Sequence, residues 1–193
     1  MERPDRFTQA ALGWVPWLAP LPEDEFTQRH WDGIVQRERA KMPYFALLAR
    51  DPEILLARTL SDFDIFTNTA GGAPRAEREL AAAATSRLNG CVFCASVHAR
   101  LASQHSGREA EVQRLLDEGP GVRLDPRWDA VIAAATALTA TPAHLGRDEI
   151  LALRERGLDD VEIADVLSGA AFFNWANRLM LSLGEPQVPA RRR

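Results

Sequence analysis

The sequence of 193 residues predicts an all-α protein with an extended N-terminal arm. Three observations favour this class. Beyond the arm, apolar residues recur at the three- and four-residue intervals that place them on one face of a helix. No segment alternates between apolar and polar residues as a half-buried strand would. Asp, Asn, Gly and Pro stand where such helices should begin and end.

The N-terminal arm, residues 1–26, is defined by its proline and tryptophan content. Proline at this density prevents a regular helix. Exposed tryptophan is unfavourable, so Trp14 and Trp17 should pack on the body of the protein or on a neighbouring subunit. A helical pattern then spans 27–41 and breaks at Pro43.

The next helices are expected from their caps. Asp51 can cap a helix that Pro52 begins, and "NTAGGAP" forms the loop after it. Pro74 can open the following helix, and the pair Asn89-Gly90 should end it, because both residues tolerate the left-handed conformation.

A further helix should run from about Cys91 to about His105, followed by one more short helical stretch. A break rich in Pro and Gly at 119–126 separates these from three C-terminal helical stretches. Asp residues before the last stretch and a Gly after it fit caps at both ends.

An internal similarity suggests two related helical units, over about 50–118 and 126–185. The segment "ERELAAAATSRLNGCVFC" aligns with "DVEIADVLSGAAFFNWAN" at an interval of 83 residues, although amphipathic helices of shared composition could mimic a repeat. The interval pairs Glu79 with Glu162, Cys91 with Asn174, and Cys94 with Asn177.

Three regions follow from this pattern: the arm, an all-helical domain over 27–185, and a basic tail over 186–193.

The net charge of −4 comes from acidic and basic residues mixed along the chain, which indicates neither a nucleic-acid partner nor an anionic membrane. No apolar run approaches the roughly 20 residues that cross a bilayer, and the N-terminus does not resemble a signal peptide. We therefore expect a cytoplasmic protein, in which two cysteines indicate catalysis or metal binding before a structural disulfide.

The stretch "NGCVFCASVH" holds both cysteines. At about 100° per residue, Cys91, Cys94 and His98 lie within about 60° of arc on one helix face. The cysteines stand near the start of that helix, where free N–H groups favour the thiolate, the reactive form of cysteine. His98 can accept the thiol proton or stabilise the thiolate.

Glu79 precedes the turn at Asn89-Gly90 by about as many residues as His98 follows it. If the two helices fold back as a hairpin, the two side chains differ in height by about 3 Å. A carboxylate at that level would orient the imidazole and raise its basicity, which completes a Glu–His–Cys relay.

Two alternative roles for the cysteines stay open. They could fill the core of an Ala-rich helix, because free Cys is commonly buried. Zinc could use Cys91, Cys94, His98 and His105, but side chains on one helix cannot surround a metal tetrahedrally. A zinc site would therefore need a further ligand from elsewhere in the chain. We expect no metal, and we expect no other cofactor either.

The pattern E-x11-C-x2-C-x3-H, realised as Glu79, Cys91, Cys94 and His98, resembles the alkylhydroperoxidase AhpD and the wider carboxymuconolactone decarboxylase-like superfamily. The context "PRAERELAAAATSRLNGCVFCASVHARLA" is similar to its peroxidase-related branch. The resemblance is strongest over about residues 50–110.

The resemblance implies an AhpD-like helical bundle that assembles into a homo-oligomer, a trimer or a hexamer. It further implies that the cysteine pair reduces a hydroperoxide while cycling between dithiol and disulfide, without metal or haem. An external thiol reductant, either a lipoyl-bearing or a thioredoxin-like protein, would reopen the disulfide. Decarboxylation is not expected, since the decarboxylases of the superfamily lack the cysteine pair.

This chain departs from the best-known AhpD proteins at Phe93, where they carry a histidine, so one possible proton donor is missing. The attacking thiol stays open: the helix start favours Cys91 and proximity to His98 favours Cys94, which we prefer slightly. Two other functions stay open as well. One is a protein disulfide reductase or redox sensor, and the other is a catalytically inactive oligomeric protein with a binding or structural role.

Overall fold

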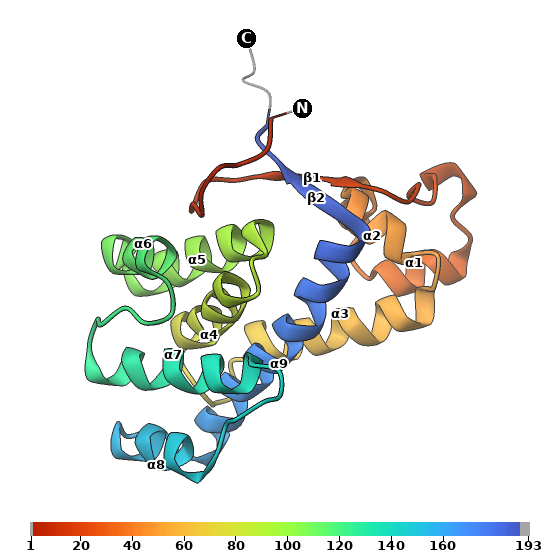
Figure 1. Ribbon diagram of the computed structural model, residues 1–193. Coiled ribbons are helices and arrows are strands. Elements are labelled where there is room, and N and C mark those ends of the chain that lie inside the picture. The colour runs from red at the N-terminus through yellow and green to blue at the C-terminus, as the bar shows by residue number, and fades with distance from the viewer. Residues whose placement is uncertain (1, 190–193) are drawn as a thin grey trace.

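The computed structural model describes residues 2–189, and helices dominate that part of the chain (Figure 1). This confirms the predicted all-α class. The helices are α1 (Gln28–Ile34), α2 (Pro43–Leu48), α3 (Pro52–Thr67), α4 (Arg75–Leu88), α5 (Val92–Ser106), α6 (Glu109–Glu118), α7 (Pro126–Thr139), α8 (Arg147–Glu155) and α9 (Asp160–Leu183). Two 3₁₀ turns, η1 (Glu23–Glu25) and η2 (Arg37–Lys41), and two strands, β1 (Gly13–Pro16) and β2 (Gly184–Gln187), complete the elements.

The two strands correct the expectation that the chain contains none. β1 pairs antiparallel with β2, with Trp14 opposite Pro186, so the N-terminal arm lies beside the segment that follows α9 (Figure 1). Each strand has only four residues, too few to show an alternating pattern in the sequence. The expected start of the basic tail at 186 therefore falls inside β2, and its last residues, 190–193, lie outside the described part of the chain.

The arm packs on the body through one of its two tryptophans. Trp14 is 6% exposed and meets the ring of Tyr44 edge to face, with 5.5 Å between the ring centroids. Trp17 is 60% exposed in the single chain, so it does not pack on the body of its own chain, and packing on a neighbouring subunit stays a prediction. The strand pair and Trp14 together hold the arm against α2 and the end of α9.

We expect the substitution Gly184→Ala to loosen this arm. A methyl group at Gly184 would collide with the indole ring of Trp14 and the carbonyl oxygen of Val15. Such overpacking costs about 1–3 kcal/mol of unfolding free energy. Urea denaturation of Gly184→Ala should show this loss, whereas Gly121→Ala, whose added methyl meets no neighbour, should change stability by less than about 0.5 kcal/mol. Equal stability of the two variants would contradict this packing of the arm.

The single helix expected over 27–41 is also wrong. Helix α1 ends at Ile34, because Val35 takes a left-handed φ of 64° and the N–H of Gln36 donates to the Ile34 carbonyl at 2.7 Å. The stretch 36–41 is rich in good helix formers but has only one apolar residue, Ala40, to bury. Helix propensity without an apolar face is too weak to extend α1 through this segment.

Helix α4 lies at the centre of the molecule, in contact with α5, α7 and α9. Its alanine run 81–84 is fully buried, and these small side chains let neighbouring helices approach closely. Two apolar clusters result. One joins α4–α9, and the other joins the arm, α1–α3, α9 and the start of α5, where both cysteines lie.

The predicted repeat does not extend to the helix boundaries. In the first unit a turn at Asn89-Gly90 separates α4 from α5, with Gly90 at a left-handed φ of 78°. The corresponding positions of the second unit, Phe172 and Phe173, lie inside the continuous helix α9. Helix α9 has no break that would fold it into a hairpin, so the helix boundaries of the two units differ, and a duplication stays a prediction.

Candidate active site

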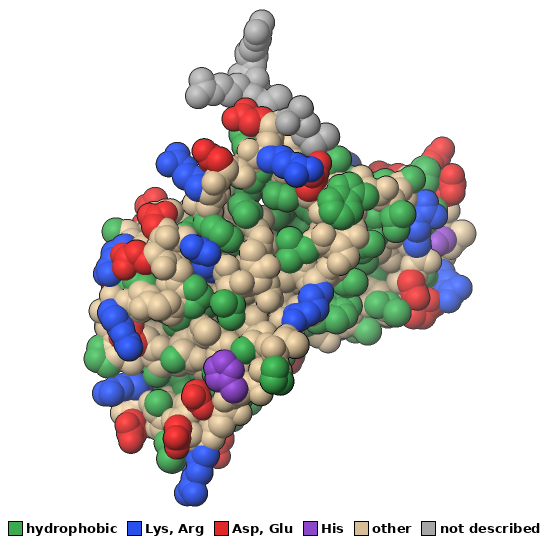
Figure 2. Space-filling model, viewed as in Figure 1, with side chains coloured by type: hydrophobic (Ala, Val, Ile, Leu, Met, Phe, Trp, Pro, Cys, Tyr) green, Lys and Arg blue, Asp and Glu red, His purple; other side chains and the backbone are tan. Residues whose placement is uncertain are grey.

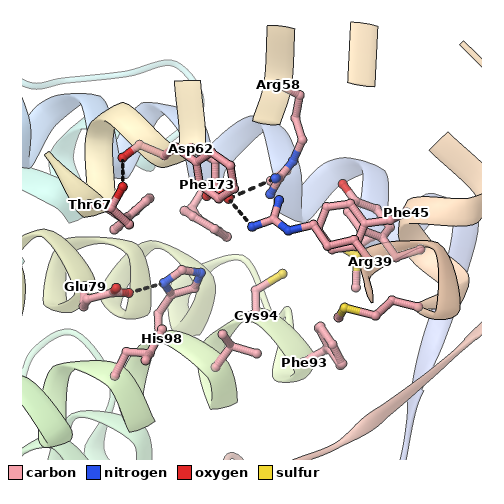
Figure 3. A pocket seen from close by; sticks show the side chains of 18 of the residues that line it. Arg39, Phe45, Arg58, Asp62, Thr67, Glu79, Phe93, Cys94, His98 and Phe173 are labelled. Atoms are coloured by element: carbon pink, nitrogen blue, oxygen red, sulfur yellow. Dashed lines mark hydrogen bonds and ion pairs between the residues drawn. The ribbon is translucent and has the colours of Figure 1, made fainter. Parts of the chain in front are cut away.

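The α4–α5 hairpin brings Glu79 and His98 together. The His98 Nδ1 lies 2.6 Å from Oε2 of Glu79, and His98 and Glu79 are 6% and 0% exposed (Figure 3). Because the carboxylate accepts this hydrogen bond, Nδ1 carries the hydrogen and Nε2 is left as the basic nitrogen. The Arg75 Nε donates to the other carboxylate oxygen at 3.1 Å, so the buried charge of Glu79 is compensated.

Two aromatic rings fix the plane of the His98 imidazole. The ring of Phe173, from α9, lies with its centroid 3.8 Å away, and that of Phe66, from α3, lies 5.3 Å away. The imidazole is therefore held between helices that are distant in the sequence. The rings pack against the imidazole, and the hydrogen bond to Glu79 is the polar contact that sets the orientation of the imidazole.

The two cysteines begin the same hairpin's second helix. Cys91 is the N-cap residue of α5 and Cys94 lies in its first turn, so their sulfurs face each other at 3.0 Å. Both are free thiols, 2% and 5% exposed. A pair at this distance can share a proton and can form a disulfide with only a small movement of the side chains.

The two thiols differ in acidity. The hydrogen bond with Cys94 lowers the pKa of Cys91 despite burial, and the backbone N–H of Cys94 and the amide of Asn177 act in the same direction. The same sulfur–sulfur contact raises the pKa of Cys94, as does its own burial. Cys91 is therefore the thiol of the pair that ionises first, and the N–H groups that begin α5 favour its thiolate.

This coupling predicts opposite shifts in two variants. Cys94→Ala removes the donor that stabilises the Cys91 thiolate, so the pKa of Cys91 should rise. Cys91→Ala removes the group that opposes ionisation of Cys94, so the pKa of Cys94 should fall. Thiolate absorbance near 240 nm, followed against pH, measures both. In wild type the first thiolate should form below the pH at which an ordinary thiol ionises. A first ionisation at the ordinary value in all three proteins would contradict the coupling.

Two asparagines of α9 fix the turn before Cys91. The Asn89 side chain donates to Asn174 Oδ1 at 3.0 Å and to Asn177 Oδ1 at 3.1 Å, and Asn177 in turn donates to Ser86 Oγ at 3.0 Å. The side chains of Asn174 and Asn177 therefore contact the end of α4, and neither residue lines the cavity beside Cys94. Both asparagines hold the start of α5 in place, and Asn177 also acts to lower the pKa of Cys91.

A cavity of about 280 Å³ opens beside Cys94 and His98 (Figure 3). Glu79, Cys94 and His98 line it, and Cys91 contacts Cys94 from outside the lining. The structure thus brings all four residues singled out in the sequence together, three of them at the cavity surface. Most of the wall is apolar and aromatic, contributed by Phe45, Phe63, Phe66, Phe93, Val97, Leu101, Phe173 and Met180, among others.

A charged group on the same cavity was not predicted from the sequence. Arg58 and Asp62 of α3 lie four residues apart and pair at 3.0 Å, and Arg39 of η2 approaches the same carboxylate at 3.6 Å. Tyr44 of α2 lines the cavity as well. One signal was present: an Arg and an Asp stand one turn apart in the largely apolar stretch "ILLARTLSDFDIF".

Residues 2–189 contain neither a metal-binding cluster nor a membrane span. No group of three or more His, Cys, Asp or Glu side chains in this range is arranged as metal ligands would be. None of the helices in this part of the chain has the length and apolar character needed to span a bilayer. On the face that Figure 2 shows, acidic and basic side chains are interspersed and neither sign gathers into a patch.

Comparisons with known proteins find similarity in sequence and in fold. The model of the carboxymuconolactone decarboxylase family matches residues 52–140. No curated protein matches the chain in a sequence search. The fold is similar to that of the alkylhydroperoxidase AhpD core of a peroxidase-related protein from Ralstonia eutropha JMP134, with a TM-score of 0.72, 23% identity, and 85% and 88% of the two chains covered.

Two further solved structures extend the comparison. A peroxidase-related protein from Silicibacter sp. TM1040 is 26% identical, with a TM-score of 0.67 over 94% of this chain and 92% of that one. The debrominase Bmp8 has the same fold at 17% identity, with a TM-score of 0.69 over 90% and 92%. A cysteine-to-alanine variant of that debrominase was solved with 2,3,4-tribromopyrrole.

Proposed function

Because the chain belongs to the AhpD-like and carboxymuconolactone decarboxylase-like superfamily, we propose that it is a thiol-dependent hydroperoxide reductase. The superfamily includes peroxidase-related proteins and a debrominase. One observation carries the proposal: a reduced cysteine pair, with its sulfurs 3.0 Å apart, lies at the same cavity as the hydrogen-bonded Glu79–His98 pair. Such a site holds a nucleophile, a base and a second thiol together.

The reaction begins at Cys94, the thiol that lines the cavity. Its proton passes to Nε2 of His98, and the sulfur attacks the terminal oxygen of the hydroperoxide. The O–O bond breaks, the alkoxide takes the proton from His98 and leaves as an alcohol, and Cys94 becomes a sulfenic acid.

The Cys91 thiolate closes the first half of the cycle. It attacks the Cys94 sulfur and expels hydroxide, which takes up a proton to give water, so that the two thiols have supplied two electrons. Glu79 stabilises the imidazolium form of His98 while it carries the proton. One hydroperoxide and two thiols thus give one alcohol, one water and one disulfide.

An external dithiol must then reduce the disulfide. Because the cysteines are 2% and 5% exposed, the reductant has to reach into the cavity. A lipoyl group on a flexible arm meets this requirement better than the broad surface of a thioredoxin-like protein. The same burial disfavours the alternative of a protein disulfide reductase and favours a small-molecule substrate. A cytoplasmic location, expected from the sequence, is part of the proposal.

The proposal includes the homo-oligomer implied by the superfamily, a trimer or a hexamer. Several large apolar side chains remain exposed in the single chain and supply surface for such contacts. They include Trp17, Leu18, Ile54, Leu60, Trp175 and Leu181.

Reductive debromination of a small aromatic compound is the second candidate. The aromatic wall of the cavity favours it, and a debrominase shares the fold. The same thiol pair would supply two electrons, the carbon–bromine bond would be replaced by carbon–hydrogen, and bromide would leave as the disulfide forms. Bromide release from a bromopyrrole, measured beside peroxide consumption, separates the two reactions.

The test of the main proposal is a thiol count. The reduced protein is treated first with substoichiometric and then with excess cumene hydroperoxide, and free thiols are counted. The chain has only two cysteines, so the count is unambiguous. We expect two thiols lost per hydroperoxide and an intramolecular Cys91–Cys94 disulfide by mass spectrometry. Two thiols that persist under excess hydroperoxide would overturn the proposal.

A further inference from the structure

The wall of the cavity opposite Cys94 and His98 carries two guanidinium groups, one buried and one partly buried (Figure 3). Arg58, from α3, is 8% exposed, and the Arg39 side chain, from η2, is 17% exposed. Both approach one carboxylate, that of Asp62, at 3.0 and 3.6 Å. The other ionic pair that lines the cavity, Arg75 with Glu79, is balanced within itself. One positive charge is therefore left without a partner on this wall.

Three hydrogen-bond donors on the same wall lack acceptors. In the described part of the chain, Arg39 Nη1, Arg58 Nε and the Tyr44 hydroxyl are buried and have no hydrogen-bond partner. Tyr44 is 7% exposed, and burial raises its pKa well above the usual range, so its hydroxyl keeps the proton. Each unpaired donor costs free energy, and buried donors without acceptors are rare in folded proteins. Three on one cavity wall indicate a missing acceptor.

The two guanidinium groups are held by aromatic rings. The ring of Phe45 lies 4.7 Å from the Arg39 guanidinium carbon and 5.2 Å from that of Arg58. Stacking of this kind fixes the planes of both groups before any ligand arrives. Burial lowers the pKa of Arg39, and the charge of Arg58 acts in the same direction, while Asp62 opposes both.

We propose that this wall is a carboxylate-binding site and that the cavity takes a small organic acid with an apolar body. The two carboxylate oxygens would accept from Arg39, Arg58 and Tyr44, and the single negative charge would match the surplus charge. The apolar body would lie along the phenylalanines between that wall and Cys94. A water molecule can satisfy one of the donors, but it does not neutralise the charge.

The binding itself does not depend on the reaction at Cys94. That the acid is the substrate, as a hydroperoxide bearing a carboxylate, rests on the proposed function. A cavity of about 280 Å³ is at the lower end of the sizes that hold small molecules, which favours a single substituted ring or a short chain. The competing role for Arg58 is to stabilise the Cys94 thiolate, since the charge of Arg58 acts to lower the pKa of Cys94 against the raising effects of Cys91 and of burial.

The first experiment measures binding without peroxide chemistry. Calorimetry measures the affinities of 4-isopropylbenzoate and of its methyl ester for the reduced wild type and for Arg58→Met. If Arg58→Met does not fold, Arg39→Met is used in its place. We expect the acid to bind wild type about tenfold to a hundredfold more tightly than the ester, and this preference to be lost in the variant. Equal affinities of acid and ester for wild type would overturn the proposal.

The second experiment tests the substrate class with a matched pair of peroxides. The ratio of kcat/KM for 4-carboxycumene hydroperoxide over cumene hydroperoxide should exceed ten in wild type and fall close to one in Arg58→Met. The control Arg114→Met, which removes an exposed ion pair on α6, should keep the wild-type ratio. An unchanged ratio in Arg58→Met, with both rates lowered equally, would show that Arg58 serves the thiolate and would overturn the substrate assignment. If neither peroxide is reduced, the proposed function fails while the calorimetry still decides the binding site.

Discussion

Cys94→Ser should abolish peroxide reduction, lowering kcat/KM by about a thousandfold or more, whereas Cys91→Ser should still react once with peroxide and then stop. Cys94 lines the cavity, and its sulfur is the one that can meet a hydroperoxide beside His98. Cys91 lies behind it and supplies the thiolate that resolves the sulfenic acid. Stopped-flow peroxide consumption and trapping of the sulfenic acid with dimedone measure the two behaviours.

Serine has nearly the shape of cysteine, so both variants should keep the fold, which near-ultraviolet circular dichroism checks. The expected product in Cys91→Ser is a dimedone adduct on Cys94. A dimedone adduct on Cys91 in the Cys94→Ser protein, with peroxide consumed at the wild-type rate, would reverse the roles of the two cysteines. The Cys91 thiolate would then be the attacking group, as its lowered pKa allows.

Glu79→Gln should slow the reaction of the thiol pair with hydroperoxide by about a hundredfold to ten-thousandfold. The glutamine can still accept a hydrogen bond from Nδ1, so the ring orientation is kept. It carries no charge, however, and so it does not stabilise the imidazolium that forms when His98 takes the thiol proton. The single-turnover rate of thiol loss under excess hydroperoxide measures the effect without interference from the reductant.

Glu77 offers a matched control on the same helix. It is 6% exposed, and both of its carboxylate oxygens accept from Arg127, at 2.6 and 2.9 Å, away from the cavity. Glu77→Gln should therefore cost about 1–3 kcal/mol of unfolding free energy and change the single-turnover rate by less than about threefold. If the two variants slow the reaction equally, the effect of Glu79 is one of general stability and not of proton transfer.

The part of the site that could be predicted from the sequence rests on local signals. The left-handed Gly90 after Asn89 fixes the hairpin, and the hairpin fixes which residues of α4 and α5 stand level. Counting residues from that turn was therefore enough to bring Glu79 to His98. The spacing of the two cysteines on one helix needs no long-range information either.

The opposite wall of the cavity could not be predicted in the same way. Arg39 comes from a segment expected to be helical, and it reaches the cavity because the chain turns at Val35. Arg58 stands on a helix whose apolar residues are not all buried; Ile54 and Leu60 are more than half exposed. Which residues of such a helix face inward depends on its packing against α1 and α9, and a single sequence does not show that packing. The pairing of β1 with β2 is long-range for the same reason.

The strand pair has a consequence for how the protein is made. A chain folds as it leaves the ribosome, N-terminal parts first. β1 emerges early, but its partner β2 follows all of the helices, so the arm has no partner while they are synthesised. Trp14, which covers Tyr44, takes its place only when β2 arrives. Closure of the arm over α2 is therefore one of the last steps in the folding of a newly made chain.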